Sequence, residues 1–218
     1  MKNNNILDTE STKRKKIKKS IKLIIVFIAI IIFAYIAEDV MEKEIFSIDN
    51  SIYSYLIRNR NEALNTFFII LTEFGGVFAI VILTALLLIF LKKEHKIMVL
   101  ANVIIITILN QVLKIIFARP RPEIMRLIEE NGYSFPSGHS MVSTAFYGLL
   151  IYLIYKNVKN KYVKWIGIIF LILLILGICI SRIYLGVHYA SDVIGGFCFS
   201  IAYIIVFINI IKKEVGPE

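Results

Sequence analysis

Chemically useful residues are concentrated in three short stretches of an otherwise apolar chain. The stretches are 114–122 (KIIFARPRP), 136–139 (PSGH) and 181–192 (SRIYLGVHYASD). Together they hold two histidines, a carboxylate and several cations, the side-chain types needed to bind a phosphate ester and split it. Ionisable groups among apolar segments are a functional signal, because lipid-like surroundings make them energetically costly.

The third stretch places a histidine and a carboxylate four residues apart. On a helical turn, His188 and Asp192 share one face. A carboxylate bonded to one ring nitrogen fixes the imidazole tautomer and leaves the other nitrogen with an exposed lone pair, which makes an activated nucleophile. Arg182, six residues earlier, is placed to add a bidentate phosphate contact. Taken alone, the stretch also fits a structural His–Asp pair at a membrane interface.

The first stretch combines two kinds of cation. Pro120 and Pro122 end the preceding helix and keep the chain extended, so Arg121 can fold back toward Lys114. A lysine supplies point charge and an arginine supplies forked donors, and a phosphate dianion uses both. The alternative is a basic cluster whose side chains reach toward lipid headgroups. That alternative explains Arg119 better than Arg121.

The second stretch has the pattern of a helix start. Ser137 is a natural N-cap, and Gly138 allows close backbone approach. The free N–H groups of a helix N-terminus attract anions. His139, in the first turn, would stand beside a bound oxyanion and is placed to protonate a leaving oxygen. A capped helix with an interfacial histidine also fits this stretch.

The rest of the chain predicts an all-α polytopic membrane protein. Of its 218 residues, 58% are apolar and four are prolines. Segments of about 20 apolar residues span a bilayer core, and six are expected: 20–37, 66–91, 97–117, 140–155, 164–180 and 190–211. The fourth and sixth carry small or polar residues that suit inward packing against other helices: Ser140, Ser143, Thr144, Ser191 and Gly195.

The expected organisation is a basic cytoplasmic tail (1–19), a six-helix membrane domain (20–211) and a cytoplasmic C-terminal end (212–218), of which VGPE is expected to fray. Between the first two spans, apolar residues recur at helical spacing, which predicts a short helix on the membrane surface. They are Ile45, Ile48, Ile52 and Leu56.

The net charge of +9 is distributed as a topology signal and argues against nucleic-acid binding. Lys and Arg number eight before residue 23, three in 92–96, four in 156–164 and two in 212–213. These segments alternate with the spans, so the positive-inside rule places them and both termini in the cytoplasm. All three chemical stretches then lie on the outer face of the cell membrane.

Three further residues need an interpretation. Glu73 is the one acidic residue well inside an expected span, and structural and site-supporting roles are equally open for it. Cys179 and Cys198 fall in expected spans, where free thiols behave as small apolar side chains. We therefore expect neither a disulfide nor a metal site from the cysteines.

Together, the patterns KX6RP, PSGH and SRX5HX3D resemble the signature of the type 2 phosphatidic acid phosphatase (PAP2) superfamily. Residues 49–76 also look like that family's surface helix and second span. The matching positions are Lys114, Arg121, Pro122, Pro136, Ser137, Gly138, His139, Ser181, Arg182, His188 and Asp192.

The resemblance implies a metal-independent hydrolase without a cofactor that works through a phosphohistidine. It implies that His188 attacks phosphorus, that Asp192 orients His188, and that His139 protonates the leaving group and then helps water to enter. It further implies that five residues hold the phosphoryl oxygens: Lys114, Arg121, Arg182, Ser137 and Gly138.

The substrate implied is a membrane lipid phosphate, with no nucleic acid and no obligatory protein partner. Undecaprenyl diphosphate, recycled for cell-wall synthesis, is slightly preferred because the site is expected to face outward. Phosphatidylglycerophosphate and phosphatidic acid are alternatives. A phosphotransferase that discharges to a lipid or sugar, and a non-catalytic lipid-phosphate binding or transport protein, are the other hypotheses.

Overall fold

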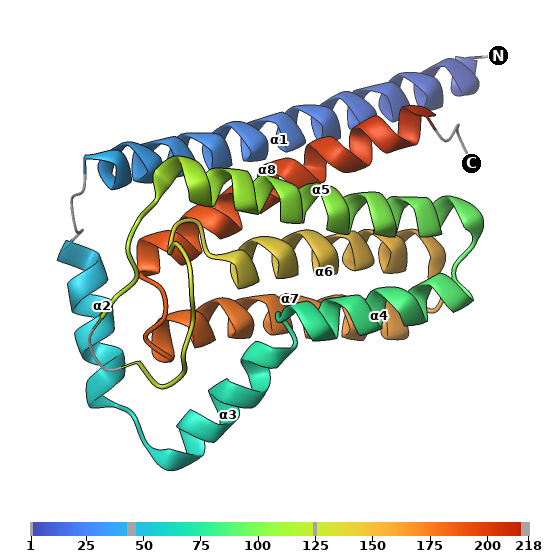
Figure 1. Cartoon of the computed structure of the whole chain (residues 1–218). Coiled ribbons are helices and arrows are strands. Elements are labelled where there is room, and N and C mark those ends of the chain that lie inside the picture. Colours follow the sequence, from blue (N-terminus) through green and yellow to red (C-terminus); the bar gives the residue numbers. More distant parts are fainter. Residues whose placement is uncertain (1, 43–46, 124–125, 215–218) are drawn as a thin grey trace.

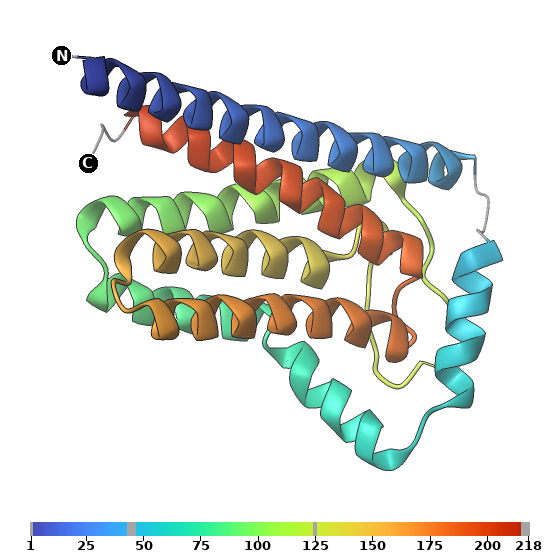
Figure 2. The same ribbon diagram turned by 180° about the vertical axis from the view of Figure 1, so that it is seen from behind.

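The structure is a computed structural model that describes residues 2–42, 47–123 and 126–214, and every regular element in these ranges is an α-helix. The helices are α1 (Lys2–Met41), α2 (Ser47–Arg58), α3 (Glu62–Glu73), α4 (Val77–Phe90), α5 (Lys93–Phe117), α6 (Gly138–Asn157), α7 (Lys161–Tyr184) and α8 (Ala190–Glu214). Figures 1 and 2 show α1, α4, α5, α6, α7 and α8 running side by side, while α2 and α3 lie at one end, where α3 packs against α7 and α2 against α7 and α8. The expected VGPE end and Ile45 lie outside the described residues.

Within the described residues, four helical segments are long and apolar enough to cross a membrane: Lys19–Met41 within α1, α5, α7, and Ala190–Ile211 within α8. Large apolar side chains lie exposed on the bundle, as expected for a surface in contact with lipid; Phe78 and Phe90 are each 83% exposed. The chain is therefore a membrane protein. Helix α1 begins before the membrane segment and includes the basic N-terminal residues. Six spans are not confirmed, because α3–α4 and α6 differ from expectation.

The expected second span, 66–91, is wrong as one continuous helix. It is broken between α3 and α4, which meet at 47° and pass the length and apolarity test only as a pair. At the break, a Cβ on Gly75 would lie 2.7 Å from Ile178 Cγ2 and 2.8 Å from Ser143 Oγ, so only glycine allows this approach to α6 and α7. Glu73 is the last residue of α3, at this break, and its side chain is exposed.

The expected fourth span, α6, is not among the helices that meet the membrane criterion. It packs against α5, α7 and α8, so its side chains meet protein on most sides. Ser140, Ser143 and Thr144 are at most 1% exposed. A helix enclosed in this way needs little hydropathy of its own, and the inward packing of these small polar residues is confirmed.

The short helix expected between the first two spans is present as α2. Its Ile52 and Leu56 are half-buried and pack against the main core, and α2 contacts the ends of α7 and α8. Cys179 and Cys198 are free thiols, as expected.

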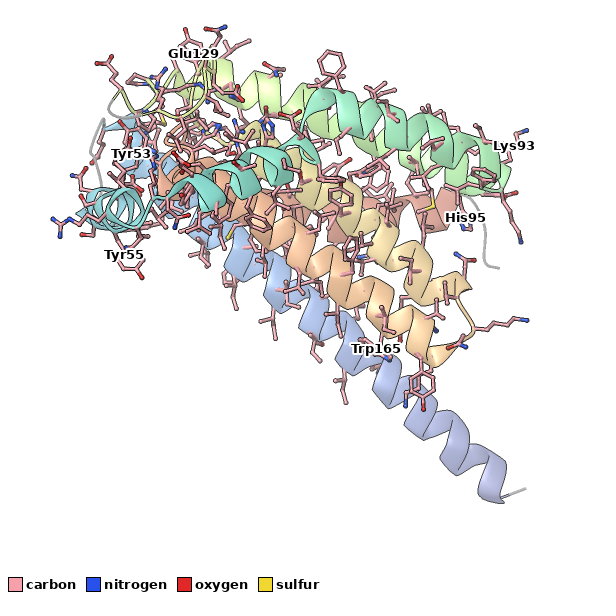
Figure 3. All side chains as sticks on the ribbon, turned by 90° about the horizontal axis from the view of Figure 1, so that it is seen from below. Tyr53, Tyr55, Lys93, His95, Glu129 and Trp165 are labelled. Atoms are coloured by element: carbon pink, nitrogen blue, oxygen red, sulfur yellow. The ribbon has the colours of Figure 1, made fainter. Side chains whose placement is uncertain are left out.

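The two ends of the bundle differ in chemistry. The α4–α5 turn, the α6–α7 turn and both chain termini lie at the same end (Figure 1). Figure 3 shows Lys93 and His95 at that end, and Tyr53 and Glu129 at the opposite one. The three chemical stretches follow α5, precede α6 and join α7 to α8, so they lie at the end opposite the termini.

Candidate active site

The structure brings the three stretches into one cluster at the end of the bundle. Lys114 is in the last turn of α5, His139 in the first turn of α6, and His188 in the turn between α7 and α8. All three line one cavity of about 790 Å³, together with Arg121 and Gly138. The other predicted site residues are buried beside it: Ser137, Arg182 and Asp192.

His188 and Asp192 are linked through Ser134. His188 Nδ1 is 3.5 Å from Asp192 Oδ2, and Ser134 Oγ lies 3.3 Å from Nδ1 while donating to Oδ2 at 2.5 Å. On the other side of the ring, Nε2 is 3.1 Å from Arg121 Nη1. A guanidinium only donates, so Nε2 accepts and the ring proton belongs on Nδ1. This tautomer gives the lone pair to Nε2.

Burial keeps the ring neutral. Desolvation lowers the pKa of His188 to about 4; Arg182 and Arg121 act in the same direction, and Asp192 opposes them. At neutral pH the imidazole is therefore uncharged, with one nitrogen free of a proton, which is the state a nucleophile requires.

Arg121 is held rigidly by backbone carbonyl groups. Its Nε donates to Gly132 O, its Nη2 to Asn131 O and its Nη1 to Val187 O, each at 3.0 Å. A guanidinium fixed on three sides keeps its charge in one place, and desolvation lowers the pKa of Arg121 without removing that charge.

Arg182 is a second buried guanidinium with a free donor. Its Nη1 donates to Thr72 Oγ1 at 2.7 Å and its Nη2 to Glu130 Oε1 at 2.5 Å. Its Nε is buried and has no hydrogen-bond partner among the described residues. Lys114 Nζ, the third cation, donates to Tyr133 O at 2.5 Å. An unsatisfied buried donor beside two further cations is a setting for an anion.

A carboxylate lies at the cation cluster. Glu130 is bonded to Arg182 and lies 3.7 Å from Arg121 Nη2, and it lines the cavity. Burial would raise the pKa of Glu130, but Arg182 and Arg121 together hold it below the usual value. The anion therefore stays charged between the two guanidinium groups. Sequence reasoning did not identify Glu130 because no motif spacing includes it.

The turn before α6 is fastened from two sides. Ser137 caps the helix, with its Oγ accepting from Ser140, and its own N–H donates to Asp192 O at 3.1 Å. A Cβ on Gly138 would lie 3.0 Å from Asn110 Oδ1, so glycine permits the approach to α5. Gly138 lines the cavity, while the polar groups of Ser137 are engaged within the protein.

The interfacial interpretation of Arg119 is wrong. Arg119 is 6% exposed and its guanidinium binds Asp192 Oδ1 at 2.6 Å, Ser191 Oγ at 2.7 Å and Asp49 Oδ2 at 3.2 Å. Sequence reasoning missed Asp49 and Ser134 as well. The repeated Arg-Pro of RPRP was the one available signal, because it places Arg119 beside a motif position.

No group of three or more His, Cys, Asp or Glu side chains that could hold a metal ion occurs in the described part of the chain. The expectation of metal-independent chemistry remains a prediction, tested by activity in the presence of a chelator.

Apolar helices with histidines and cations clustered at one end are the arrangement expected of a membrane-embedded phosphatase. The PAP2 superfamily model matches residues 95–215, more than half of the chain, and the chain belongs to this family of membrane lipid phosphatases. It is accordingly a hydrolase.

Similar proteins carry two kinds of name. Phosphatidylglycerophosphatase B of Bacillus subtilis is 39% identical over 92 residues, which cover 41% of this chain and 45% of that protein. The chain thus matches less than half the length of this relative. Undecaprenyl-diphosphatase of Sulfolobus acidocaldarius is 30% identical over 168 residues, 73% of this chain and 75% of that protein.

Two crystal structures share the fold. The transmembrane PAP2 type phosphatidylglycerolphosphate phosphatase from Bacillus subtilis superposes with a TM-score of 0.74 at 27% identity, covering 88% of this chain and 96% of that one. Aquifex aeolicus LpxE gives a TM-score of 0.63 at 26% identity, covering 75% of this chain and 96% of its own.

Proposed function

We propose that the chain removes a terminal phosphate from a membrane lipid phosphate or diphosphate through a phosphohistidine on His188. One observation carries the proposal: the lone pair of His188 Nε2 lies beside Arg121 at a cavity that also contains Lys114 and His139. A nucleophile, a second histidine and fixed cations are the parts that phosphoryl transfer to nitrogen requires.

The reaction has two balanced steps. His188 Nε2 attacks phosphorus, the bond from phosphorus to the oxygen that bridges it to the rest of the lipid breaks, and protonated His139 donates a proton to that oxygen. Burial and the nearby cations lower the pKa of His139, so His139 must take up its proton together with the substrate, whose negative charge offsets those cations. Water, losing a proton to His139, then attacks phosphorus; the P–N bond breaks and free phosphate leaves. Lys114, Arg121 and Arg182 balance charge on the phosphoryl oxygens, and Asp192 supports the imidazolium through the dyad.

The shape of the cavity supports a lipid substrate. From the cationic end it continues between α4 and α5, where its walls are apolar. These wall residues are Val77, Ile80, Val81, Val103, Ile104, Ile108 and Ile115. A phosphate group at the cations would therefore leave its hydrocarbon chain between α4 and α5, facing the bilayer.

Undecaprenyl diphosphate, converted to undecaprenyl phosphate, is the preferred substrate, with phosphatidylglycerophosphate or phosphatidic acid as the alternative. The names of relatives include an undecaprenyl-diphosphatase and a phosphatidylglycerophosphatase. The preference rests on an outward-facing site. The basic segments lie at the end of the bundle opposite the cavity, and the positive-inside rule assigns the end with the basic segments to the cytoplasm. The proposed organisation keeps 1–19 and 212–218 in the cytoplasm and the membrane domain at 20–211.

A panel of lipid phosphates tests the function and the substrate together. Purified chain in detergent is expected to release free phosphate, without any acceptor, fastest from undecaprenyl diphosphate and more slowly from phosphatidylglycerophosphate and phosphatidic acid. Release without an acceptor argues against a phosphotransferase. Absence of phosphate release from every lipid would contradict the enzyme proposal and favour a binding or transport protein.

A substitution in the apolar part of the cavity, between α4 and α5, complements the substrate panel. Val81→Trp narrows the apolar part of the cavity, so KM for a long-chain lipid should rise while a short soluble phosphate ester is spared. Phe78→Trp changes an exposed residue of the same helix that does not line the cavity, and it should alter neither substrate.

Glu130→Gln should tighten substrate binding. The carboxylate competes with phosphate for Arg121 and Arg182, and charge-assisted hydrogen bonds of this kind are worth enough that KM should fall by about three- to tenfold with kcat little changed. Inhibition by inorganic phosphate should strengthen by a similar factor. Glu129→Gln, an exposed neighbour, is the control. A rise in KM would instead mean that Glu130 supports the cations.

A further inference from the structure

A chain of buried charges runs from α2 to the back of the His188–Asp192 dyad. Asp49 of α2 is 1% exposed and Arg119 is 6% exposed. Arg119 joins the two carboxylates, with Nη1 at 2.6 Å from Asp192 Oδ1 and Nη2 at 3.2 Å from Asp49 Oδ2. Buried ion pairs often add little net stability even when they are hydrogen-bonded, so this arrangement points to a role other than stability.

Asp49 is tied to the helix that carries Asp192. The Ser191 N–H donates to Asp49 Oδ1 at 2.8 Å, and Ser191 Oγ donates to Asp49 Oδ2 at 2.6 Å. Arg119 Nη1 also donates to Ser191 Oγ. The first turn of α8, where Asp192 lies, is therefore clamped between α2 and the loop after α5.

The two oxygens of Asp192 have different partners. Oδ2 is the oxygen on the side of His188, and it accepts hydrogen bonds from Ser134 Oγ at 2.5 Å and from the Tyr189 N–H at 2.8 Å. Oδ1 accepts from Arg119. With both oxygens held, the carboxylate plane cannot turn away from His188.

We infer that Arg119 and Asp49 are positioning residues for the reaction, which orient Asp192 and through it the imidazole of His188. The inference rests on the proposed function. Outer partners of metal-binding histidines change activity by about 10- to 100-fold without touching the substrate, and by analogy we expect an effect of that order here. The same contacts fasten the surface helix α2 to the site.

Arg119 also moderates the effect of Asp192 on His188. Its positive charge offsets part of the carboxylate's negative charge, which otherwise favours protonated imidazole. The charged and titratable groups that act on His188 come from several elements: Asp192, Arg121, Arg182, Glu130 and His139. Removing Arg119 leaves all of these in place, so His188 should bind a proton at higher pH.

Kinetics of Arg119→Gln and Asp49→Asn in the full chain test the inference. We expect kcat to fall by about 10- to 100-fold for Arg119→Gln, and less for Asp49→Asn, with KM changed less than about threefold. For Arg119→Gln, the acid limb of the kcat/KM profile should move to higher pH. The double variant should lose little more than Arg119→Gln alone, because the two residues act as one unit.

Two exposed positions of α2 provide matched controls. Asn50→Ala and Arg58→Gln change a polar and a basic side chain of the same helix that are exposed to solvent. Both variants should retain the kcat and pH profile of the unmodified chain. If Arg119→Gln aggregates on gel filtration, Arg119→Lys, which keeps the charge but loses the fork, carries the kcat test together with Asp49→Asn. Because its charge is kept, the acid limb of Arg119→Lys should stay in place.

Opposite results would overturn the inference. The inference fails if Arg119→Gln leaves both kcat and the acid limb of the kcat/KM profile unchanged. It also fails if the kcat losses of the two single variants multiply in the double variant, as they would for independent sites. Failure of the proposed function is distinguishable, because it would appear in the unmodified chain as absence of phosphate release, or as full activity in His188→Ala. Either of those would remove the function and the inference together.

Discussion

His188→Ala is expected to lose turnover by at least about a thousandfold on every lipid phosphate and to form no phosphoenzyme. The substitution removes the Nε2 lone pair, and no other described side chain in the cavity combines a neutral imidazole with the Ser134 and Asp192 contacts. Phosphate release from the purified variant is the measurement. Phosphate binding should persist, since the cations remain.

The chain supplies a matched histidine control. His95, one of three histidines, lies at the opposite end of the bundle (Figure 3). His95→Ala should keep full activity, which separates loss of the nucleophile from a general loss of fold. Retention of more than about a tenth of the activity by His188→Ala would exclude His188 as the nucleophile.

His139→Asn is expected to slow lipid hydrolysis by about 10²- to 10⁴-fold, the usual contribution of a positioned general acid. The lipid in this test is a phosphate monoester such as phosphatidic acid, whose alkoxide oxygen is a poor leaving group without a proton. The nitrophenolate of p-nitrophenyl phosphate leaves without one, so its first turnover should be nearly unaffected. Water entry still needs a base, so a burst of nitrophenolate followed by a slow steady state should appear in rapid-mixing measurements.

The burst distinguishes a proton-transfer role from a structural one. If His139→Asn slows the first turnover equally for the lipid and for p-nitrophenyl phosphate, His139 does not protonate the leaving group. His139 lines the cavity, and its ring lies close enough to Gly75 that a Cβ there would be 3.2 Å from His139 Cδ2. Unfolding of the variant should be compared with that of His95→Ala to exclude repacking.

Local spacing predicted the parts of the site that neighbours in sequence determine. His188 and Asp192 are separated by one helical turn, Ser137 caps the helix that holds His139, and each relation depends on a few adjacent residues. The long apolar segments predicted α1, α5, α7 and α8 for the same reason.

Features that depend on tertiary packing were not predicted. Asp49 meets Ser191 across 142 positions of sequence, so no local pattern reveals the contact or the burial of Arg119. The break at Gly75 follows from how closely α6 and α7 approach, which a hydropathy profile of 66–91 does not show. Similarly, α6 is enclosed by other helices, so its low hydropathy does not reveal that it belongs to the membrane domain.

Detection of phosphate on His188 during turnover tests the central proposal most directly. Purified chain is mixed with a lipid phosphate, quenched in alkali, in which phosphohistidine survives, and digested for mass spectrometry of the peptide that contains His188. The proposal predicts phosphate on His188 in the unmodified chain, more of it in His139→Asn when p-nitrophenyl phosphate replaces the lipid, and loss of the signal in acid. Continued release of free phosphate with no phosphate on His188, or with phosphate on another residue, would contradict it.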